Sequence, residues 1–192
     1  MTVIGSLGTL TDLPSAVSVL QPQSADVARS NTYSGNYGFG EFPLHTDFAH
    51  WFVPPRYMAL RAVVGSEHVS TRVFDGRHLI ESRGSASLQR MLVQPRRPIL
   101  GQRALLQILQ EIPPDVCLRW DPLFLVAATA SSTEDFESIR EWLARSTCDE
   151  VTLRDPGDVL LIDNWRMLHG RSAVYGGSSD RQLERAYLES VF

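Results

Sequence analysis

Leu44-His45-Thr46-Asp47-Phe48 is the most informative stretch of this sequence. If it forms a strand, alternate side chains face opposite sides, so His45 and Asp47 point one way and their neighbours the other. One imidazole and one carboxylate on the same face make half of a metal site. His-x-Asp alone is a weak signal. The alternative without a metal is a solvated polar face on an edge strand.

A histidine that can complete the site lies far along the chain, in the segment Asp163-Asn164-Trp165-Arg166-Met167-Leu168-His169-Gly170. Two histidines and one carboxylate on one face of an octahedral ion are the ligands of non-haem Fe(II) oxygenases, which keep the other positions open. A hydrogen-bonded core histidine is the competing interpretation of His169. His45, Asp47 and His169 are therefore the candidate metal ligands.

Composition predicts an ordinary globular protein. The 192 residues are 43% hydrophobic and 21% charged, which fits a single domain, residues 1–192, with a sizeable core. A net charge of -4 argues against a nucleic-acid partner, and no apolar run reaches the length of a membrane span. No positive charge precedes Arg29, so a secretory n-region is missing, and with only Cys117 and Cys148 a reducing cytoplasm is expected.

Short strands dominate the expected secondary structure. The sequence predicts strands at 57–64, 70–74, 116–120, 152–153, 159–162 and 181–188, with a further short one at 17–20. The run 159–162 is unbroken and apolar, which predicts burial on both sides. Residues 1–30 form either a packed peripheral arm or a partly disordered one. The glycines and asparagines of 31–40 predict a loop, whose aromatic residues either line a pocket or pack within the loop.

Two helices are expected in the middle of the chain. Apolar residues at helical spacing predict one over 102–112, in a region, 77–115, that is helical with proline breaks. Ser132 or Thr133 caps a second helix, which ends near Arg145. Many short strands with few helices favour a mainly β fold with flanking helices, a sandwich or jelly roll, over an alternating α/β sheet.

Taken together, the motifs resemble one family. They are, in order, Leu44-His45-Thr46-Asp47, Thr71 before Phe74-Asp75-Gly76, Pro156-Gly157-Asp158-Val159-Leu160, Asp163 to Arg171, and Arg181-Gln182-Leu183. This pattern is similar to the taurine dioxygenase and γ-butyrobetaine hydroxylase family of Fe(II)/2-oxoglutarate-dependent oxygenases. The resemblance covers residues from about 40 to the C-terminus, with a blurred middle, and the segment around His169 is its most specific part.

The resemblance implies a fold, two cofactors and a ligand set. The fold would be the double-stranded β-helix, a jelly roll, and the cofactors Fe(II) and 2-oxoglutarate, with O2 as oxidant. His45, Asp47 and His169 resemble the iron ligands, Thr71 the hydroxyl that touches the co-substrate, and Arg181 the arginine that pairs with its distal carboxylate. Halogenating relatives lack the carboxylate ligand, so Asp47 favours hydroxylation or another oxidation.

The chemistry of 2-oxoglutarate supports these roles. Its keto acid end chelates iron at two positions and its far carboxylate needs a forked cation, which arginine supplies. Arg181 and Arg185 are four residues apart on one expected strand and share a face, so either could do this. Arg181 fits the family pattern better. Arg185 is a departure from it, either exposed or facing an anionic substrate group.

Residues close in sequence to His45 and Asp47, together with Arg185, are the candidates for contact with the substrate. They are Glu41, Phe48, His50, Trp51 and Arg185. We expect a small-molecule substrate, such as an amino acid or a biosynthetic intermediate, with a polar and an apolar part. Asn164 and Trp165 are expected to be structural. The alternative function is a cupin-like jelly-roll metal binder with a different activity or none, although cupins bring more histidines close in sequence.

Overall fold

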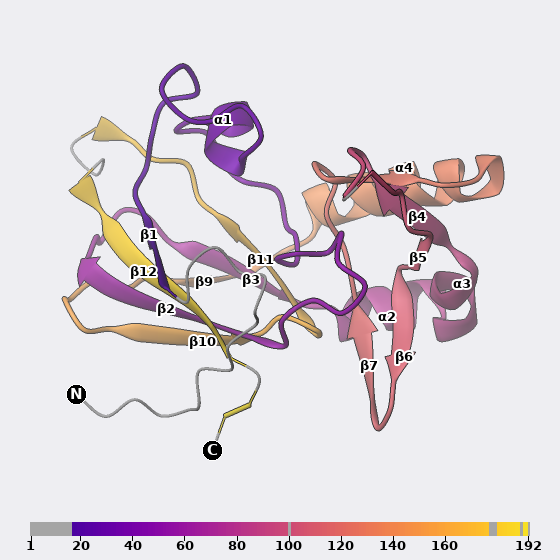
Figure 1. Ribbon diagram of the computed structural model, residues 1–192. Helices are drawn as coiled ribbons and strands as arrows, with labels where there is room; N and C mark the ends of the chain where they lie inside the picture. Colours follow the sequence, from indigo (N-terminus) through magenta and orange to yellow (C-terminus); the bar gives the residue numbers. More distant parts are fainter. Residues whose placement is uncertain (1–16, 100, 177–179, 189, 192) are drawn as a thin grey trace.

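Two antiparallel sheets form the β part of the molecule (Figure 1). The computed structural model describes residues 17–99, 101–176, 180–188 and 190–191. The first sheet has the order β1-β12-β2-β10, formed by Val17–Leu20, Gln182–Leu188, Tyr57–Val64 and Val159–Asp163. The second has the order β11-β3-β9, formed by Met167–Arg171, Thr71–Asp75 and Asp149–Val151.

The two sheets share an apolar cluster. Burial alternates along β2, so Met58, Leu60 and Ala62 face the same side. They pack with Leu183 and Tyr187 of β12 and Ile162 of β10, while Val73 of β3 and Met167 of β11 reach the cluster from the second sheet. His169 lies two residues beyond Met167 on β11, so the alternation aims it toward the same space between the sheets.

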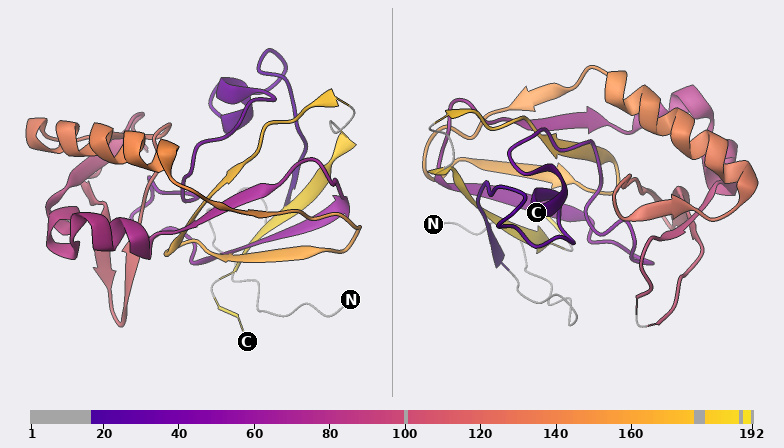
Figure 2. Two further views of the ribbon diagram at one scale, coloured as in Figure 1. Left: turned by 180° about the vertical axis from the view of Figure 1, so that it is seen from behind. Right: turned by 90° about the horizontal axis from the view of Figure 1, so that it is seen from above.

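Three of the helices gather at one end of the molecule, beyond the ends of both sheets (Figure 2). They are α2 (Arg77–Arg83), α3 (Ser85–Arg90) and α4 (Ala130–Arg145). Around them lie a sheet of β5 (Leu106–Gln107), β4 (Leu92–Pro95) and β8 (Leu125–Ala127), and a hairpin of β6 (Leu109–Ile112) and β7 (Asp115–Leu118). Their core joins the β part through Phe74 of β3 and Leu168 of β11.

The mainly β architecture with flanking helices is confirmed. The expected strands at 17–20, 57–64, 70–74 and 181–188 correspond to β1, β2, β3 and β12, and that at 116–120 corresponds to β7, which ends at Leu118. A helix does end at Arg145, but it begins one turn earlier than predicted, because Thr129 is the cap that accepts the Ser132 amide. The expected loop at 31–40 contains a short helix, α1 (Tyr33–Tyr37), capped by Thr32.

The expected helix over 102–112 is wrong, because this segment forms β5 and β6. Leu106 and Ile108 are buried while Gln107 between them is exposed, which is the two-residue period of a strand. β4 pairs with β5 and β7 pairs with β6. Apolar residues at helical spacing are overridden here by pairing with neighbouring strands.

Two further strand predictions need correction. Val159 and Leu161 of β10 are 59% and 47% exposed, so this strand is not buried on both sides. It lies at an edge of its sheet, where Ile162 is buried in the core and Leu160 packs against it, half-buried. The strand expected at 152–153 lies slightly earlier, as β9, where it pairs with β3.

The stretch 44–48 is not a strand. His45 makes a single antiparallel bridge to His169, and the chain turns from Asp47 onward. Phe48 has a φ of 54°, a left-handed conformation that is uncommon for residues other than glycine. The direction of Asp47 is therefore set by this turn and not by strand alternation.

Within the described part of the chain no helix is long and apolar enough to cross a membrane. Cys117 and Cys148 are both free thiols. Burial raises the pKa of the Cys117 thiol to about 12, so it is not a reactive thiolate at neutral pH.

Candidate metal centre and its cavity

Backbone pairing brings the two candidate histidines together. The His45 amide donates to the His169 carbonyl and the His169 amide to the His45 carbonyl, each at 2.8 Å. Side chains opposite each other in such a pair lie on one face, and the two imidazole centroids are 4.5 Å apart. Gly170 allows this approach, because a Cβ there would lie 2.5 Å from the Phe42 carbonyl oxygen.

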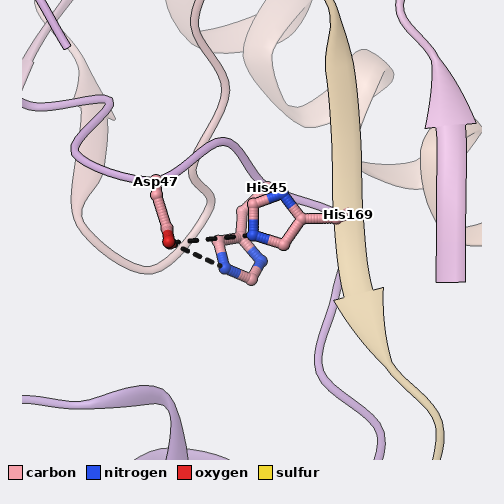
Figure 3. A group of neighbouring side chains, drawn as sticks. All are labelled: His45, Asp47 and His169. Carbon is pink, nitrogen blue, oxygen red and sulfur yellow. Dashed lines mark ion pairs between the residues drawn. The ribbon is translucent and has the colours of Figure 1, made fainter. Parts of the chain in front are cut away.

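Asp47 completes the cluster (Figure 3). Its Oδ1 lies 3.5 Å from His45 Nε2 and 3.7 Å from His169 Nε2. One ligand atom from each of the three residues fits within 4.8 Å of the others, and this is the only such cluster among the residues that the structure describes. The structure therefore brings together the three ligands expected from the sequence.

The ring nitrogens of His45 are assigned by their surroundings. Its Nδ1 lies 2.9 Å from the Pro43 carbonyl oxygen, which can only accept, so Nδ1 carries a proton and Nε2 is the nitrogen placed to bind a metal. The His169 Nδ1 is buried and has no hydrogen-bond partner among the described residues. Both Nε2 atoms face Asp47, which is the side on which an ion would sit.

Asn164 fixes the turn that carries Asp47. It is fully buried, and its side-chain oxygen accepts the Asp47 amide at 2.7 Å. Its side-chain nitrogen donates to the carbonyls of Asp47 and Pro55, each at 2.9 Å. The segment before His169 therefore holds the segment after His45. The structural role expected of Asn164 is to fix the backbone at Asp47.

The other carboxylate oxygen of Asp47 has protein donors. Its Oδ2 accepts from the Tyr187 hydroxyl at 2.6 Å and from Arg185 Nη1 at 3.1 Å. Burial alone would raise the pKa of the Asp47 carboxyl, but the Arg185 cation and the two imidazoles outweigh it and hold this pKa well below its usual range. Asp47 is therefore a carboxylate, as a metal ligand must be.

The cluster opens into a cavity of about 760 Å³. Tyr33, Phe124, His50, Phe48 and Tyr187 line it, and successive ring centroids in this series lie 5.0 to 6.0 Å apart. Tyr33 also stacks on His45 at 4.0 Å, so these rings form an arc that begins beside one candidate ligand and ends at the hydroxyl bound to another.

Arg181 and Thr71 lie together in the same cavity. Arg181 is 5% exposed, and its Nη2 is 3.4 Å from Thr71 Oγ1. Its Nε has no partner and no acidic side chain pairs with it among the described residues. Burial lowers the pKa of this guanidinium to about 10, still far above neutral, so Arg181 is a buried cation that lacks an anion.

The candidate substrate residues divide into two groups. Phe48, His50 and Arg185 line the cavity. Glu41 does not, because it forms an ion pair with Arg72 and faces a separate, smaller pocket. Trp51 does not line the cavity either, and its ring packs on Phe48 at 4.7 Å.

Three contributors were not anticipated from the sequence. Tyr187 holds Asp47, and Asp121 is a buried carboxylate that accepts the Tyr33 hydroxyl at 2.8 Å. Arg171 is buried, lies over the Phe42 ring at 3.7 Å and donates to the carbonyls of Gly38 and Gly40. Of these three residues, only Arg171 has a sequence feature that could have identified it, which is its position directly after His169-Gly170. The other two depend on contacts between distant segments.

A family model gives independent evidence on ancestry. The model described as "Taurine catabolism dioxygenase TauD, TfdA family" matches residues 117–187, the part that contains His169, Arg181 and Arg185. This C-terminal part of the chain is similar to the TauD, TfdA family. A trimethyllysine dioxygenase from Neurospora crassa is 43% identical over 49 residues, which are 24% of this chain and 10% of that protein.

Solved structures share the fold of this chain over most of its length. An asparagine oxygenase in complex with Fe(II), 2S,3S-3-hydroxyasparagine and succinate has a TM-score of 0.69 at 19% identity, over 90% of this chain and 56% of that one. The non-heme iron oxygenase OrfP, in complex with Fe and alpha-ketoglutaric acid, has a TM-score of 0.65 at 24% identity, over 91% and 57%. This chain thus spans little more than half the length of these relatives.

Proposed function

We propose that this chain is a non-haem Fe(II)- and 2-oxoglutarate-dependent oxygenase that hydroxylates, or otherwise oxidises, a small molecule. The observation that carries the proposal is the presence, in one cavity, of a His-Asp-His cluster and a buried arginine that has no ion pair among the described residues. The fold would be the double-stranded β-helix of the TauD-like oxygenases, which the likeness to the asparagine oxygenase supports.

The donor set suits Fe(II). His45, Asp47 and His169 offer two imidazole nitrogens and one carboxylate oxygen from one side, which leaves the opposite positions of an octahedral ion open. The pKa of the His169 imidazole is lowered by burial and by His45 beside it, which favours the neutral form that binds metals. The same donors accept other divalent ions, so the identity of the metal rests on chemistry and not on geometry alone.

Arg181 is the proposed anchor of 2-oxoglutarate. A buried cation without a partner is costly unless an anion neutralises it, and the fork of a guanidinium matches a carboxylate. The Thr71 hydroxyl beside it adds a hydrogen-bond donor. Arg185 is the weaker candidate, because its Nη1 is already bound to Asp47.

Bound Fe(II) and 2-oxoglutarate would together activate O2, with one oxygen atom going to the substrate and the other to succinate as CO2 is released. The chain itself binds and orients. Asn164 holds the backbone of Asp47, Pro43 fixes the proton of His45, and Arg181 with Thr71 sets the direction of the co-substrate. The arc of aromatic rings excludes water from one wall of the cavity.

The substrate side of the cavity favours a small molecule with an apolar part and a polar or anionic one. Phe48 offers an apolar surface, while His50 Nδ1 and Arg185 Nε have no hydrogen-bond partner in the part of the chain that the structure describes. Similar chains were solved with hydroxyasparagine and with hydroxy-L-arginine, which supports an amino acid or a related compound here. Glu41 and Trp51 are not included in this substrate set, since neither lines the cavity.

The second candidate function is a cupin-like metal binder with a different activity or none. Both candidates predict metal binding at His45, Asp47 and His169, so metal binding alone does not separate them. Arg181 separates the two candidates, because only an oxygenase that uses 2-oxoglutarate needs an anion site beside the metal.

The test is a substrate screen on the whole chain. The protein is loaded with Fe(II) and 2-oxoglutarate without oxygen, a panel of amino acids and related compounds is added, and succinate is measured after exposure to O2. We expect succinate release that rises with one compound class and disappears in His45→Ala. No succinate above the level of His45→Ala, with any compound or with none, contradicts the proposed function.

A further inference from the structure

The two oxygens of the Asp47 carboxylate lie in different surroundings. Oδ1 faces the imidazoles, at 3.5 and 3.7 Å from the two Nε2 atoms. Oδ2 faces the other way and accepts from the Tyr187 hydroxyl at 2.6 Å and from Arg185 at 3.1 Å. Only one oxygen of this carboxylate is therefore turned toward the position of a metal.

Tyr187 is the more firmly held of the two donors. Its ring is 6% exposed, packs edge-on against Phe48 at 5.0 Å and belongs to the cluster between the sheets. Its strand, β12, pairs with β2 directly opposite Met58. A phenol is ordinarily uncharged near neutral pH, so the hydroxyl has the proton that it donates to Asp47.

Arg185 is a less permanent partner. Its side chain is 27% exposed, it lines the cavity, and its Nε has no partner among the described residues. An anion that enters the cavity competes with Asp47 for this guanidinium. The phenol of Tyr187 carries no charge, so the same anion leaves its hydrogen bond to Asp47 in place.

This difference bears on how Asp47 binds a metal. A carboxylate with both oxygens free can bind a divalent ion through one or through both. With two imidazoles, binding through one oxygen leaves three open positions on an octahedral ion and binding through both leaves two. The proposed function needs three, because 2-oxoglutarate fills two and O2 needs one.

We propose that Tyr187 is a positioning residue that keeps Asp47 bound to the metal through Oδ1 alone. Its hydroxyl occupies Oδ2 from the side opposite the histidines and so preserves the third open position. The inference rests on the proposed function only in treating His45, Asp47 and His169 as metal ligands.

The test uses Mn(II) as a probe, because the relaxation rate of water protons reports how many water molecules are bound to this ion. Tyr187→Phe keeps the ring and removes the hydroxyl. We expect the relaxation rate of the Mn(II)-loaded protein to fall by roughly a third, as three bound waters become two. Removing a hydrogen bond to a metal ligand also changes the affinity for the metal, by about tenfold or more.

Tyr33→Phe is the matched control. It removes another buried hydroxyl from the same cavity, and that hydroxyl binds the carboxylate of Asp121, which is not a candidate ligand. We expect its Mn(II) affinity to stay within about twofold of the wild type and its relaxation rate to be unchanged. Thermal melts of both variants establish that each is folded at the temperature of the measurement.

A Tyr187→Phe protein with the relaxation rate of the wild type overturns the proposal, whatever its affinity for Mn(II). So does a rate that rises, because Asp47 has then left the metal. The proposed metal site is tested separately by His45→Ala. If His45→Ala binds Mn(II) as tightly as the wild type does, the ligand set itself is wrong. That result is distinct from a failure of the proposal for Tyr187 alone.

Discussion

His45 and His169 exchange both backbone hydrogen bonds, each at 2.8 Å, although His45 belongs to no regular strand. Residues paired in this way present their side chains on the same face. Two candidate ligands from distant parts of the chain are therefore aligned by main-chain pairing, before any side-chain contact acts. The geometry of the site depends on how closely residues 42–45 can approach β11.

Gly170→Ala tests this dependence. The added Cβ would meet the Phe42 carbonyl at 2.5 Å, so the backbone of residues 42–45 must move away from β11. We expect a loss of about 1–3 kcal/mol in the free energy of unfolding and weaker Mn(II) binding. Gly65→Ala is the control, because its Cβ would meet the Arg154 carbonyl at 1.8 Å, outside the metal site. Equal Mn(II) affinities in the two folded variants contradict the role of this approach.

Asn164→Ala removes the link between the two halves of the site. The Asp47 amide and the carbonyls of Asp47 and Pro55 lose their side-chain partner at a buried position. We expect a destabilisation of about 3 kcal/mol, measured by urea unfolding, with weaker metal binding in the protein that stays folded. Asn36→Ala, which removes two exposed side-chain hydrogen bonds, should cost at most about 1 kcal/mol. Similar losses in both variants would show that burial of Asn164 adds nothing.

Arg181→Gln should weaken the binding of 2-oxoglutarate and spare the metal. The buried fork is lost, so we expect the dissociation constant for 2-oxoglutarate to rise by about a hundredfold, measured by calorimetry on the Mn(II)-loaded protein. Arg185→Gln is the comparison, with an expected change of less than about tenfold. If Arg185→Gln has the larger effect, the two arginines have been assigned the wrong way round.

The sequence predicted the ligand set better than the segments that carry it. His45, Asp47 and His169 were identified by residue type and order, and the structure brings them together even though 44–48 is not a strand. Strand alternation was the wrong reason for their shared direction. The turn at Asp47 and the hydrogen bonds from the Asn164 side chain to the backbone of this turn set the direction of Asp47. A turn held by a residue from another segment leaves no local pattern.

Periodicity failed where neighbouring strands decided the structure. Residues 102–112 have apolar spacing that suits a helix, yet β4 and β7 supply partners that make two strands more stable. The exposure of Leu161 on β10 has a similar origin, since the position of a strand in its sheet depends on the order of the other strands. Long amphipathic or capped elements such as α4, and the alternating strand β2, were predicted because their signals are local.

Asp75 should make the stability of the protein depend on pH. Arg166 binds both of its oxygens, at 2.5 and 3.1 Å, while the Arg77 guanidinium binds Oδ2 and the Arg77 backbone amide binds Oδ1. The Arg166 hydrogen bonds outweigh burial and hold the pKa of the Asp75 carboxyl well below its usual 3.8. A lowered pKa stabilises the fold above the unfolded value and this stabilisation is lost as the pH falls through the folded one.

We therefore expect Asp75→Asn to lower the free energy of unfolding by about 1 kcal/mol near neutral pH, since both arginines are partly exposed. The difference from wild type should begin to shrink below about pH 4, the unfolded value, and should disappear only as the pH falls through the lowered pKa of folded Asp75, measured by chemical denaturation. Asp155→Asn, at an exposed carboxyl without an ion pair among the described residues, should show no such trend. A difference that grows as the pH falls contradicts the assignment.

His50 and Trp51 are adjacent in sequence and should have opposite phenotypes. His50 lines the cavity between Phe48 and Phe124, and its buried Nδ1 has no hydrogen-bond partner among the residues that the structure describes. His50→Phe keeps a ring in this place and removes the nitrogen. With the substrate found by the succinate screen, we expect KM for that substrate to rise about tenfold or 2-oxoglutarate turnover to become uncoupled from product. Binding of metal and of 2-oxoglutarate should be unchanged.

Trp51 packs on Phe48 outside the cavity, so its contribution should be to stability. Trp51→Ala is expected to lower the free energy of unfolding by about 2 kcal/mol, with wild-type KM in the protein that remains folded. Phe48 and His50 then form this wall of the cavity, and Trp51 packs on Phe48 without lining the cavity. A raised KM in Trp51→Ala together with an unchanged KM in His50→Phe would reverse these roles and place the substrate on the other face of the Phe48 ring.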